Sequence, residues 1–474
     1  MIFSSPVFIF LFLPLVLLAN FVCKNNYRNF VLIIASLFFY AWGETFYIAI
    51  MIISIIVNYT GGLLIEKYRG KNHAKILIIV IIGINLSILM WFKYINFFLD
   101  NFNEVLSCLK MSKISLDPVH LPIGISFFTF QALSYIIDVY QGKMEGQRKL
   151  THIALYISLF PQLIAGPIVR YTDIASEIAK RSISLDDFLY GVRRFIIGFA
   201  KKMIIANSMG ELADQIMGLS YGNYTALLAW IGAIAYTLQI YYDFSGYSDM
   251  AIGLGRMLGF HFPENFKFPY ISRSIREFWT RWHITLSSWF KDYLYIPAGG
   301  NRISPARTYM NLLLVFFLCG LWHGASWNFI IWGFFHGIFI VIEQKGVSKL
   351  LSRLWRPLQH FYVLMIVILA WVFFRLENFS DALAYIKTMF GFSTGAIAKF
   401  HLSHYLGVEK IIILVAGIIL SIPVADMLKK YANQRVITQW IFAIGDAFIM
   451  MMFFLFSLML MASETYNPFI YFRF

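Results

Sequence analysis

The chain has 474 residues, of which 59% are hydrophobic and only 14% are charged, whereas soluble domains average about 45–50% apolar and about 25% charged residues. This composition excludes an ordinary soluble domain. The net charge of +14 does not indicate a nucleic-acid partner, because the Lys and Arg residues cluster between apolar segments, as in the cytoplasmic loops of membrane proteins. We therefore expect a polytopic protein surrounded by membrane lipid.

The first apolar segments follow one another with short polar connections. Residues 1–22 are apolar and are followed by Lys24 and Arg28, so we expect an uncleaved span that starts outside and ends in the cytoplasm. The polar segment 100–118 is expected outside. A span needs roughly 20 apolar residues, and the next ones are expected at residues 46–65, 76–99 and 119–139. Residues 29–42 form a shorter segment, for which a tilted span and a re-entrant element are both open.

The middle of the chain is less regular. Residues 153–170 contain Pro161, Gly166 and Pro167 within an apolar stretch, which predicts a broken or re-entrant element whose freed backbone groups are satisfied by protein or water. Residues 262–308 are rich in Trp, Arg, Tyr and Gly, and we expect short helices and loops there. The remaining helices are expected at residues 188–206, 224–242, 309–320, 325–342, 358–374, 409–427 and 441–462.

These segments predict an all-α polytopic membrane protein with roughly eleven to thirteen membrane elements. No linker or low-complexity segment divides the chain, so a single membrane domain over residues 1–474 is expected. Cys23, Cys108 and Cys319 are far apart, and they predict neither a disulfide framework nor a metal site.

Polar residues at membrane depth are the first functional candidates, because an ionisable group is costly to place there. Gln239, Asp243, Ser245 and Asp249 follow an apolar helix. Two carboxylates with hydroxyl groups between them could bind a metal ion or a sugar, or they could be hydrogen-bonded structural groups. The sequence leaves both interpretations open.

A second group of candidates precedes His283. Arg273 and Arg276 are one helical turn apart and would share a helix face, where they could hold a phosphate or a phosphopantetheine arm. They could equally mark the cytoplasmic interface. Trp279 and Trp282 are candidates for interfacial anchors.

A third group surrounds His323, which follows Trp322 between two apolar runs. Gly320 and Gly324 flank it and leave room for a ligand or for a close backbone approach. A neutral imidazole there can take a proton from a hydroxyl, although a buried histidine is often a satisfied core residue. His336 is a weaker candidate. The Gly-x-Ser-x-Gly and His-Glu-x-x-His motifs of hydrolases and metalloproteases are absent.

At these residues the sequence resembles a known family, the membrane-bound O-acyltransferases, and most closely their bacterial alginate O-acetyltransferase membrane subunits. Any one of the matching motifs would be weak, but together they are highly specific. They are Phe3–Ser5, Phe38–Trp42, Leu121–Phe127, Ser134–Tyr140, Leu163–Pro167, Asp243–Gly255, Glu264–Lys267, Glu277–Ser287, Asp292–Ile296, Gly299–Arg302 and Gly320–Ala325.

The resemblance implies a ring of tilted, partly broken helices around a central polar funnel in the bacterial cytoplasmic (inner) membrane. The family's two hallmark histidines fall on His283 and His323. His323 would be the general base for an acceptor hydroxyl that attacks an acyl thioester, and His283 would orient the donor or stabilise the oxyanion. The residues expected to bind donor or acceptor are Gln239, Asp243, Ser245, Asp249, Arg273, Arg276, Trp279 and Trp322.

The resemblance also implies substrates and partners. The donor would be acetyl-CoA or an acyl-carrier protein in the cytoplasm, with no bound cofactor and no metal. The acceptor would be alginate-like exopolysaccharide or peptidoglycan, reached through an extracytoplasmic acetyl-accepting partner protein. Gln162 and Ser326 stand where the alginate relatives commonly have His and Asn, and both departures could bear on donor or acceptor preference.

Two other functions remain open. A sister group transfers D-alanine to teichoic acid, and the donor would separate that reaction from acetyl transfer. A transporter without covalent chemistry would also have broken helices. Such a transporter should repeat its interrupted helices in two halves, whereas the polar elements here crowd into residues 239–336.

Overall fold

The computed structural model describes residues 1–220, 224–392, 402–424, 436–463 and 466–470, and every regular element within these ranges is helical. The chain divides into two compact units. Unit 1 contains residues 1–192 and 251–263, and unit 2 contains residues 193–250 and 264–474. The expected single domain over the whole chain stays a prediction.

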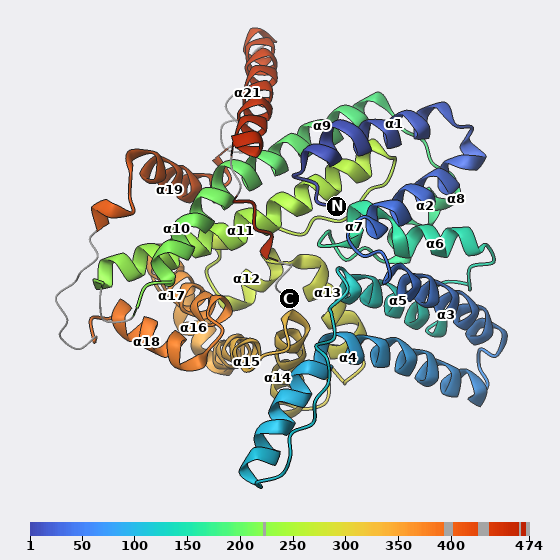
Figure 1. Cartoon of the computed structure of the whole chain (residues 1–474), viewed down its shortest axis with the longest axis horizontal. Helices are drawn as coiled ribbons and strands as arrows, with labels where there is room; N and C mark the ends of the chain where they lie inside the picture. The colour runs from blue at the N-terminus through green and yellow to red at the C-terminus, as the bar shows by residue number, and fades with distance from the viewer. Residues whose placement is uncertain (221–223, 393–401, 425–435, 464–465, 471–474) are drawn as a thin grey trace. The chain divides into compact units, whose positions relative to one another are not determined.

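Unit 1 contains the N-terminal helices (Figure 1). The polar segment 100–118 begins as helix, because α4 continues to Cys108. Lys110, just after the helix, has a φ of 58°. The elements are η1 (Phe8–Phe12), α1 (Leu13–Val22), α2 (Asn25–Ala41), α3 (Ile48–Lys67), α4 (Asn72–Cys108), α5 (Ile125–Tyr140), α6 (Leu150–Ser158), α7 (Phe160–Leu163) and α8 (Tyr171–Ala179).

Helices α3, α4 and α5 pack against one another in unit 1. Asn58 on α3 and Asn85 on α4 exchange side-chain hydrogen bonds of 3.0 Å, which is a common way for polar residues to join helices inside a membrane. Both asparagines are buried. This pair of asparagines therefore joins α3 to α4.

The predicted break in 153–170 is confirmed. Helix α6 ends at Ser158, Leu159 leaves the helical region with a ψ of 110°, and α7 restarts at Phe160. The side chain of Gln162 donates to the carbonyl of Tyr156 at 2.6 Å, so it satisfies a backbone group that the break sets free. The residue that departs from the alginate relatives thus supports the break itself.

Unit 2 holds the candidate site residues. Helix α11 runs past residue 242, where it was expected to end, because cationic side chains compensate its polar half. Helices α9 and α11 have residues in both units. Together with them, the elements of unit 2 are α9 (Leu185–Ala200), η2 (Lys201–Ala206), α10 (Asn207–Met217), α11 (Ala226–Met257), η3 (Pro269–Ile271), α12 (Ile275–Arg281), α13 (Ile284–Phe290), η4 (Lys291–Tyr295), α14 (Pro305–His323), α15 (Trp327–Ile342), η5 (Glu343–Val347), α16 (Ser348–Leu351), α17 (Arg356–Arg375), α18 (Phe379–Met389), η6 (Leu402–His404), α19 (Val408–Leu420) and α21 (Val436–Ser463).

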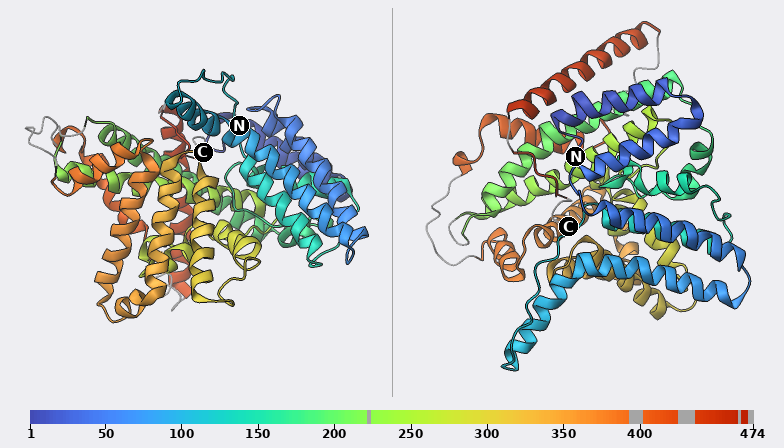
Figure 2. Two further views of the ribbon diagram at one scale, coloured as in Figure 1. Left: turned by 90° about the horizontal axis from the view of Figure 1, so that it is seen from below. Right: turned by 45° about the vertical axis from the view of Figure 1, so that its right-hand side comes forward.

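Helices α14, α15 and α17 lie side by side in unit 2, as the left view of Figure 2 shows. Helices α12 and α13 have seven residues each, which confirms the short helices predicted within 262–308. The expected span 409–427 begins as α19, and its last three residues lie outside the described ranges. The short helix α12 packs against α13 and against the long helix α15.

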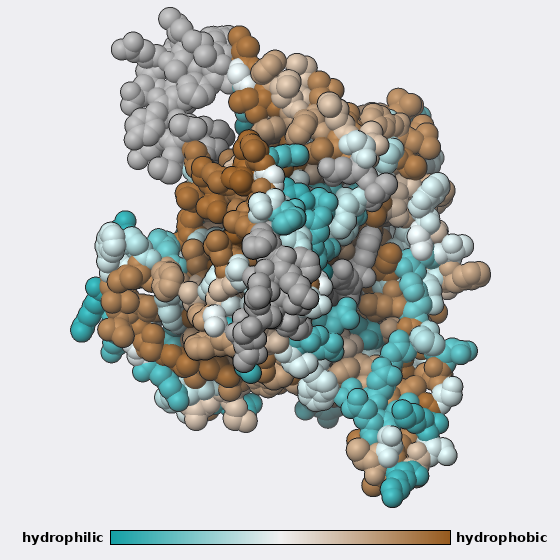
Figure 3. All heavy atoms as spheres, turned by 60° about the vertical axis from the view of Figure 1, so that its left-hand side comes forward, coloured by the Kyte–Doolittle hydropathy of each residue, from teal (hydrophilic) through white to brown (hydrophobic). Residues whose placement is uncertain are grey.

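Six helices in the described residues are long and apolar enough to cross a membrane, and two shorter apolar helices accompany them at Phe8–Val22 and Ile125–Tyr140. Hydrophobic side chains cover broad areas of the surface (Figure 3). In the span Ile444–Ser463 only 6% of the residues are buried, so its side chains are free to face lipid. The chain is a multi-pass membrane protein, and the ring arrangement stays a prediction.

Candidate active site

His283 lies at the junction between α12 and α13, where it is the residue before α13. Its φ of 44° and ψ of 53° place it in the left-handed region, which non-glycine residues rarely adopt and which often marks a functional position. Its side chain is fully buried. The ring of Phe244, on α11, meets the imidazole edge to face at 4.6 Å.

Asn265 determines which nitrogen of His283 carries the proton. Its Oδ1 lies 3.1 Å from Nδ1 of His283 and also accepts from Oγ1 of Thr285 at 2.9 Å. Its Nδ2 donates to Oγ of Ser248 at 3.1 Å. This network identifies Oδ1 as the acceptor, so Nδ1 of His283 is the donor and Nε2 has a lone pair.

Nε2 of His283 has no hydrogen-bond partner among the described residues. His283 lies outside the candidate spans, and burial lowers its pKa to about 3, because a charged imidazole would lose its hydration. The ring is therefore neutral near pH 7. A neutral ring with this tautomer accepts a hydrogen bond through Nε2, and it cannot donate one there to an oxyanion.

His323 is the last residue of α14, at the turn into α15, and is 3% exposed. The rings of Trp332 and Phe374 meet its imidazole edge to face at 5.0 and 5.2 Å. These aromatic walls keep bulk water from the ring. A histidine in such a site can exchange a proton with a bound hydroxyl without competition from solvent.

Gly320 does not make room for a ligand. A Cβ atom there would collide with the carbonyl oxygen of Phe329, and one on Gly333 would collide with the carbonyl of Phe316. A Cβ on Gly324 would collide with the ring of Phe329. Of the two interpretations of these glycines, the structure supports close packing of α14 on α15, as small residues commonly allow in membrane helices.

Trp322 joins the two histidines. Its ring centroid lies 5.8 Å from that of His283 and 5.0 Å from that of His323, with interplanar angles of 64° and 81°. The histidines are 40 positions apart in the sequence, and the fold gathers them around one indole. Trp322 is 4% exposed, so its indole is buried between the two imidazoles.

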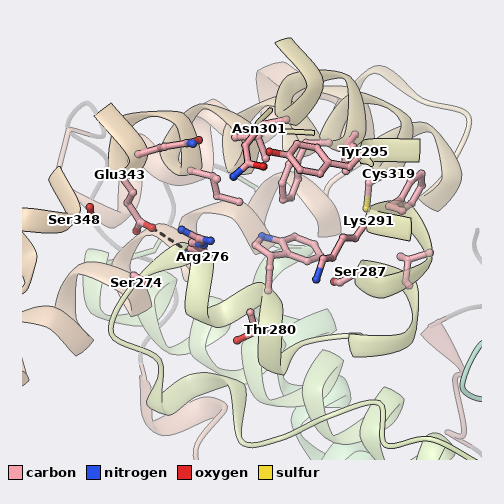
Figure 4. A pocket seen from close by; sticks show the side chains of 18 residues that line it. Ser274, Arg276, Thr280, Ser287, Lys291, Tyr295, Asn301, Cys319, Glu343 and Ser348 are labelled. Carbon is pink, nitrogen blue, oxygen red and sulfur yellow. Dashed lines mark hydrogen bonds between the residues drawn. The ribbon is translucent and has the colours of Figure 1, made fainter. Parts of the chain in front are cut away.

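A cavity of about 420 Å³ lies beside this group and is lined by polar and apolar side chains (Figure 4). Neither histidine lines it. Cys319 does, and it precedes His323 by one turn of α14, which is about 6 Å along a helix axis. The residues of the lining that carry charge or hydrogen-bonding groups include Arg276, Ser287, Lys291, Tyr295, Asn301 and Glu343.

Arg276 and Arg273 are separated by the start of α12. The helix begins at Ile275, so the prediction that the two arginines share a helix face is wrong. Arg276 lines the cavity, whereas Arg273 does not and lies 3.8 Å from the carboxylate of Glu277. The N-cap role of Ser274, whose hydroxyl accepts from the Glu277 amide at 3.0 Å, sets this boundary.

The carboxylate of Glu343 caps the same helix from outside it. It accepts hydrogen bonds from the amides of Ile275 at 2.6 Å and Arg276 at 3.1 Å, and Figure 4 shows the second of these. Negative charge at a helix N-terminus is favourable. Glu343 therefore joins α12 to the end of α15 and forms one edge of the cavity.

Trp279 and Trp282 are buried, so their interpretation as interfacial anchors is wrong. Trp279 lines the cavity, and its ring lies 5.2 Å from His336 and 5.8 Å from Trp332. His336 is fully buried among these rings and lines no described cavity. Its place in the aromatic packing supports the view that it is the weaker candidate.

The two carboxylates of α11 are paired with cations. Asp243 lies 2.6 Å from Nζ of Lys202 and accepts from the amide of Ile470 at 2.9 Å. Asp249 lies 2.6 Å from both Arg194 and Lys201. This geometry supports the structural interpretation, and no group of three or more His, Cys, Asp or Glu in the described chain could hold a metal ion.

Gln239 and Ser245 differ from these carboxylates. Both side chains are buried, and Oε1 of Gln239 and Oγ of Ser245 have no hydrogen-bond partner in the described parts of the chain. A Cβ on Gly210 would meet Nε2 of Gln239 at 2.5 Å, so Gln239 packs directly on α10. The expected role of both residues in binding stays a prediction.

Comparison with known proteins identifies the family. The model of the membrane-bound O-acyltransferase family matches residues 148–380. A probable alginate O-acetylase of Pseudomonas putida is 39% identical over 100% of both chains. The chain belongs to the membrane-bound O-acyltransferase family. It is an O-acyltransferase, and the transporter hypothesis is set aside.

Two further relatives of this O-acyltransferase carry different names. A peptidoglycan O-acetyltransferase of Helicobacter pylori is 36% identical over 85% of this chain and 82% of its own. A teichoic acid D-alanyltransferase of Bacillus subtilis is 28% identical over 53% of this chain and 66% of its own. Relatives of this chain are therefore named for the transfer of different acyl groups.

Several residues of this O-acyltransferase's site were not singled out as candidates from the sequence. Asn265, which orients His283, lies within one of the matching motifs, and so do Tyr295 and Asn301 of the cavity, whereas Lys291 immediately precedes the motif Asp292–Ile296. The signal that could have found them is the presence of polar residues among aromatic ones in 262–308. Their roles depend on which side chains face one another, and spacing alone does not predict that.

Proposed function

We propose that this O-acyltransferase moves an acetyl group from a cytoplasmic thioester to a cell-surface polysaccharide outside the bacterial inner membrane. Relatives named for acetylation of alginate and peptidoglycan, 39% and 36% identical over most of the chain, support acetyl as the group. The acceptor would be an alginate-like exopolysaccharide or peptidoglycan. A partner protein outside the membrane would receive the acetyl group first.

The observation that carries the proposal is the meeting of His283 and His323 on the ring of Trp322. His323 would remove the proton from the acceptor hydroxyl as its oxygen attacks the thioester carbonyl. The new ester C–O bond forms, the C–S bond breaks, and the proton passes to the leaving thiolate. General-base catalysis of this kind contributes about 10²–10⁴-fold.

His283 would position a reactant by accepting a hydrogen bond at Nε2. Its Nδ1 is committed to Asn265, so Nε2 has a lone pair and no proton. This argues for the orienting role expected of His283 and against the oxyanion-stabilising role, which needs a donor. An amide N–H of a pantetheine arm or an acceptor hydroxyl would suit this lone pair.

The cavity lined by Arg276 and Lys291 would admit the donor. It runs from Ser348 and Glu343, next to the basic segment that starts at Lys345, to Cys319 near His323. Basic segments favour the cytoplasmic side. A phosphopantetheine arm has a phosphate for the two cations and a chain that could reach toward His323. Both acetyl-CoA and an acyl-carrier protein present this arm.

The test measures ester-bound acetate released by mild alkali from exopolysaccharide and from purified cell wall. Cells carry the native protein, His323→Ala, or the control His73→Ala, which changes an exposed histidine of α4, at equal membrane levels. We expect His323→Ala to lower acetate by about 10²-fold or more in one fraction, which then names the acceptor. His73→Ala should leave it unchanged.

Unchanged acetate in both fractions would contradict the proposal. The same extracts would then be assayed for D-alanine ester, since one relative is named for D-alanyl transfer to teichoic acid. A loss of that ester in His323→Ala would assign D-alanine as the transferred group. Loss of neither ester would remove His323 from the chemistry.

A further inference from the structure

Unit 1 contains a second cavity, of about 390 Å³, that is unrelated to the histidine site. It lies where the starts of α2 and α6 and the end of α8 meet. Among the residues that line it, all of them described, there is no carboxylate. Its basic lining residues are Arg28, Lys149, His152, Lys180 and Arg181, and the side chains of Asn25, Asn26 and Asn29 complete its polar lining.

Two of these residues have buried nitrogen atoms without a hydrogen-bond partner in the described chain, the half-buried Arg181 and the buried His152. Nε and Nη1 of Arg181 are buried and make no hydrogen bond with the described chain. His152 is 8% exposed, and its Nδ1 is likewise buried without a partner there. Buried polar groups are nearly always hydrogen-bonded, and a bound ion is one explanation for an exception.

The charge on Arg181 is poorly compensated. Burial and then the nearby charge of Arg28 lower the pKa of Arg181 to about 10, although Glu177 acts in the opposite direction. Both oxygens of Glu177 are engaged by His261, at 2.6 Å from Nδ1 and 3.0 Å from the amide. The Arg181 guanidinium is also stacked 4.6 Å from the ring of Phe260. A bound anion would supply the acceptors and the charge that are missing.

The N-termini of α2 and α6 also favour a bound anion. Helices α2 and α6 have Lys24 and Lys149 at their N-cap positions, and neither residue makes a side-chain capping bond. Lysine is an unfavourable neighbour of the positive end of a helix dipole, whereas an anion is stabilised there. Two uncapped helix starts therefore adjoin a cavity that is rich in cations.

We propose that this cavity binds a phosphate group, and that the phosphate belongs to the headgroup of an anionic phospholipid. The exposed side chains of Tyr27, Phe30 and Leu150 lie on α2 and α6 next to the cavity residues in sequence, with exposed fractions of 62%, 57% and 44%. They offer apolar surface for acyl chains. Lys24, Arg28, Arg148 and Lys149 lie at this end of unit 1, and such basic segments favour the cytoplasmic side, where basic pockets between helices bind anionic lipid headgroups.

The test uses the full-length protein purified in detergent and stripped of lipid. Phosphatidylglycerol, phosphatidylcholine or inorganic phosphate is then added, and bound lipid is counted by native mass spectrometry together with the thermal unfolding midpoint. We expect phosphatidylglycerol to be retained and to raise the midpoint, and phosphatidylcholine to do neither. Stabilisation by inorganic phosphate equal to that by phosphatidylglycerol would instead identify a soluble anion and overturn the lipid assignment.

Variants locate the site. Lys149→Gln changes an exposed residue and should weaken retention roughly fivefold, the effect of one basic residue near an anionic lipid surface. Arg181→Gln should weaken it more. The control Arg353→Gln removes the same charge from an exposed position of unit 2 outside the cavity. Equal losses in Lys149→Gln and Arg353→Gln would show general attraction to charge and overturn the proposal.

Discussion

Oδ1 of Asn265 lies 3.1 Å from Nδ1 of His283 and also accepts from Thr285, so the asparagine sets the tautomer of the histidine. Asn265→Ala should remove this acceptor and let the ring turn or change tautomer. We expect acyl transfer to fall by roughly 10²-fold, the effect of misplacing a reactant by about 1 Å. Thr285→Val keeps the Asn265–His283 contact and should have a much smaller effect. The measurement is the transfer rate in purified membranes, and similar losses in both variants would contradict the orienting role.

The protonation of His283 should appear in stability and not in the rate near neutral pH. Burial lowers its pKa from 6.5 to about 3 in the folded protein. Between these values the unfolded chain binds a proton that the native chain does not, so this contribution to stability is present above pH 6.5 and is lost as the pH falls toward 3. His283→Gln should therefore show a shallower loss of thermal stability from pH 6.5 to 4 than the native protein. Equal slopes would show that His283 titrates normally.

The close contact of α14 and α15 makes Gly320 intolerant of a side chain. Gly320→Ala would bring a Cβ against the Phe329 carbonyl and should destabilise the protein by about 1–3 kcal/mol, as overpacking does. The matched control is Gly83→Ala on α4, where a Cβ would meet open space. That change should be neutral or stabilising by up to about 1 kcal/mol from helix propensity. Thermal unfolding in detergent checks both, and a stable Gly320→Ala protein would contradict the packing.

The buried pair of Asp243 and Lys202 should behave as a structural unit. Asp243→Ala leaves the lysine charge uncompensated and should destabilise the protein by about 3–5 kcal/mol. The double variant Asp243→Leu with Lys202→Met removes both charges and should recover most of that loss. Unfolding and transfer rate are measured together. A stable double variant that transfers no acyl group would show that the pair has a role in transfer and would contradict a purely structural role.

Lys291 should contribute to donor affinity if the cavity takes a phosphopantetheine arm. Lys291→Gln should raise the KM for the donor by roughly tenfold, the effect of losing one charge-assisted hydrogen bond, with little change in kcat. Lys267→Gln removes the same charge from an exposed position outside the cavity lining and serves as the control. An unchanged KM in Lys291→Gln would place the donor elsewhere.

Much of the fold could be predicted because its determinants are local. Apolar runs predicted the long helices, and Pro161 with its neighbours predicted the break that follows Ser158. Helix α11 was predicted too short, since Asp243 and Asp249 look like the end of a span. They remain helical because Lys202, Arg194 and Lys201, far away in sequence, neutralise them.

The sequence by itself determined that the chain is a helical membrane protein and which two histidines to consider, because composition and short motifs are properties of neighbouring residues. Only the tertiary structure decided that Trp322 touches both histidines, that Asn265 fixes the tautomer of one, and that Arg276 lines the cavity without Arg273. These relationships depend on how side chains from separate helices pack. Packing is a property of the whole fold, since each contact exists only when both helices are in place.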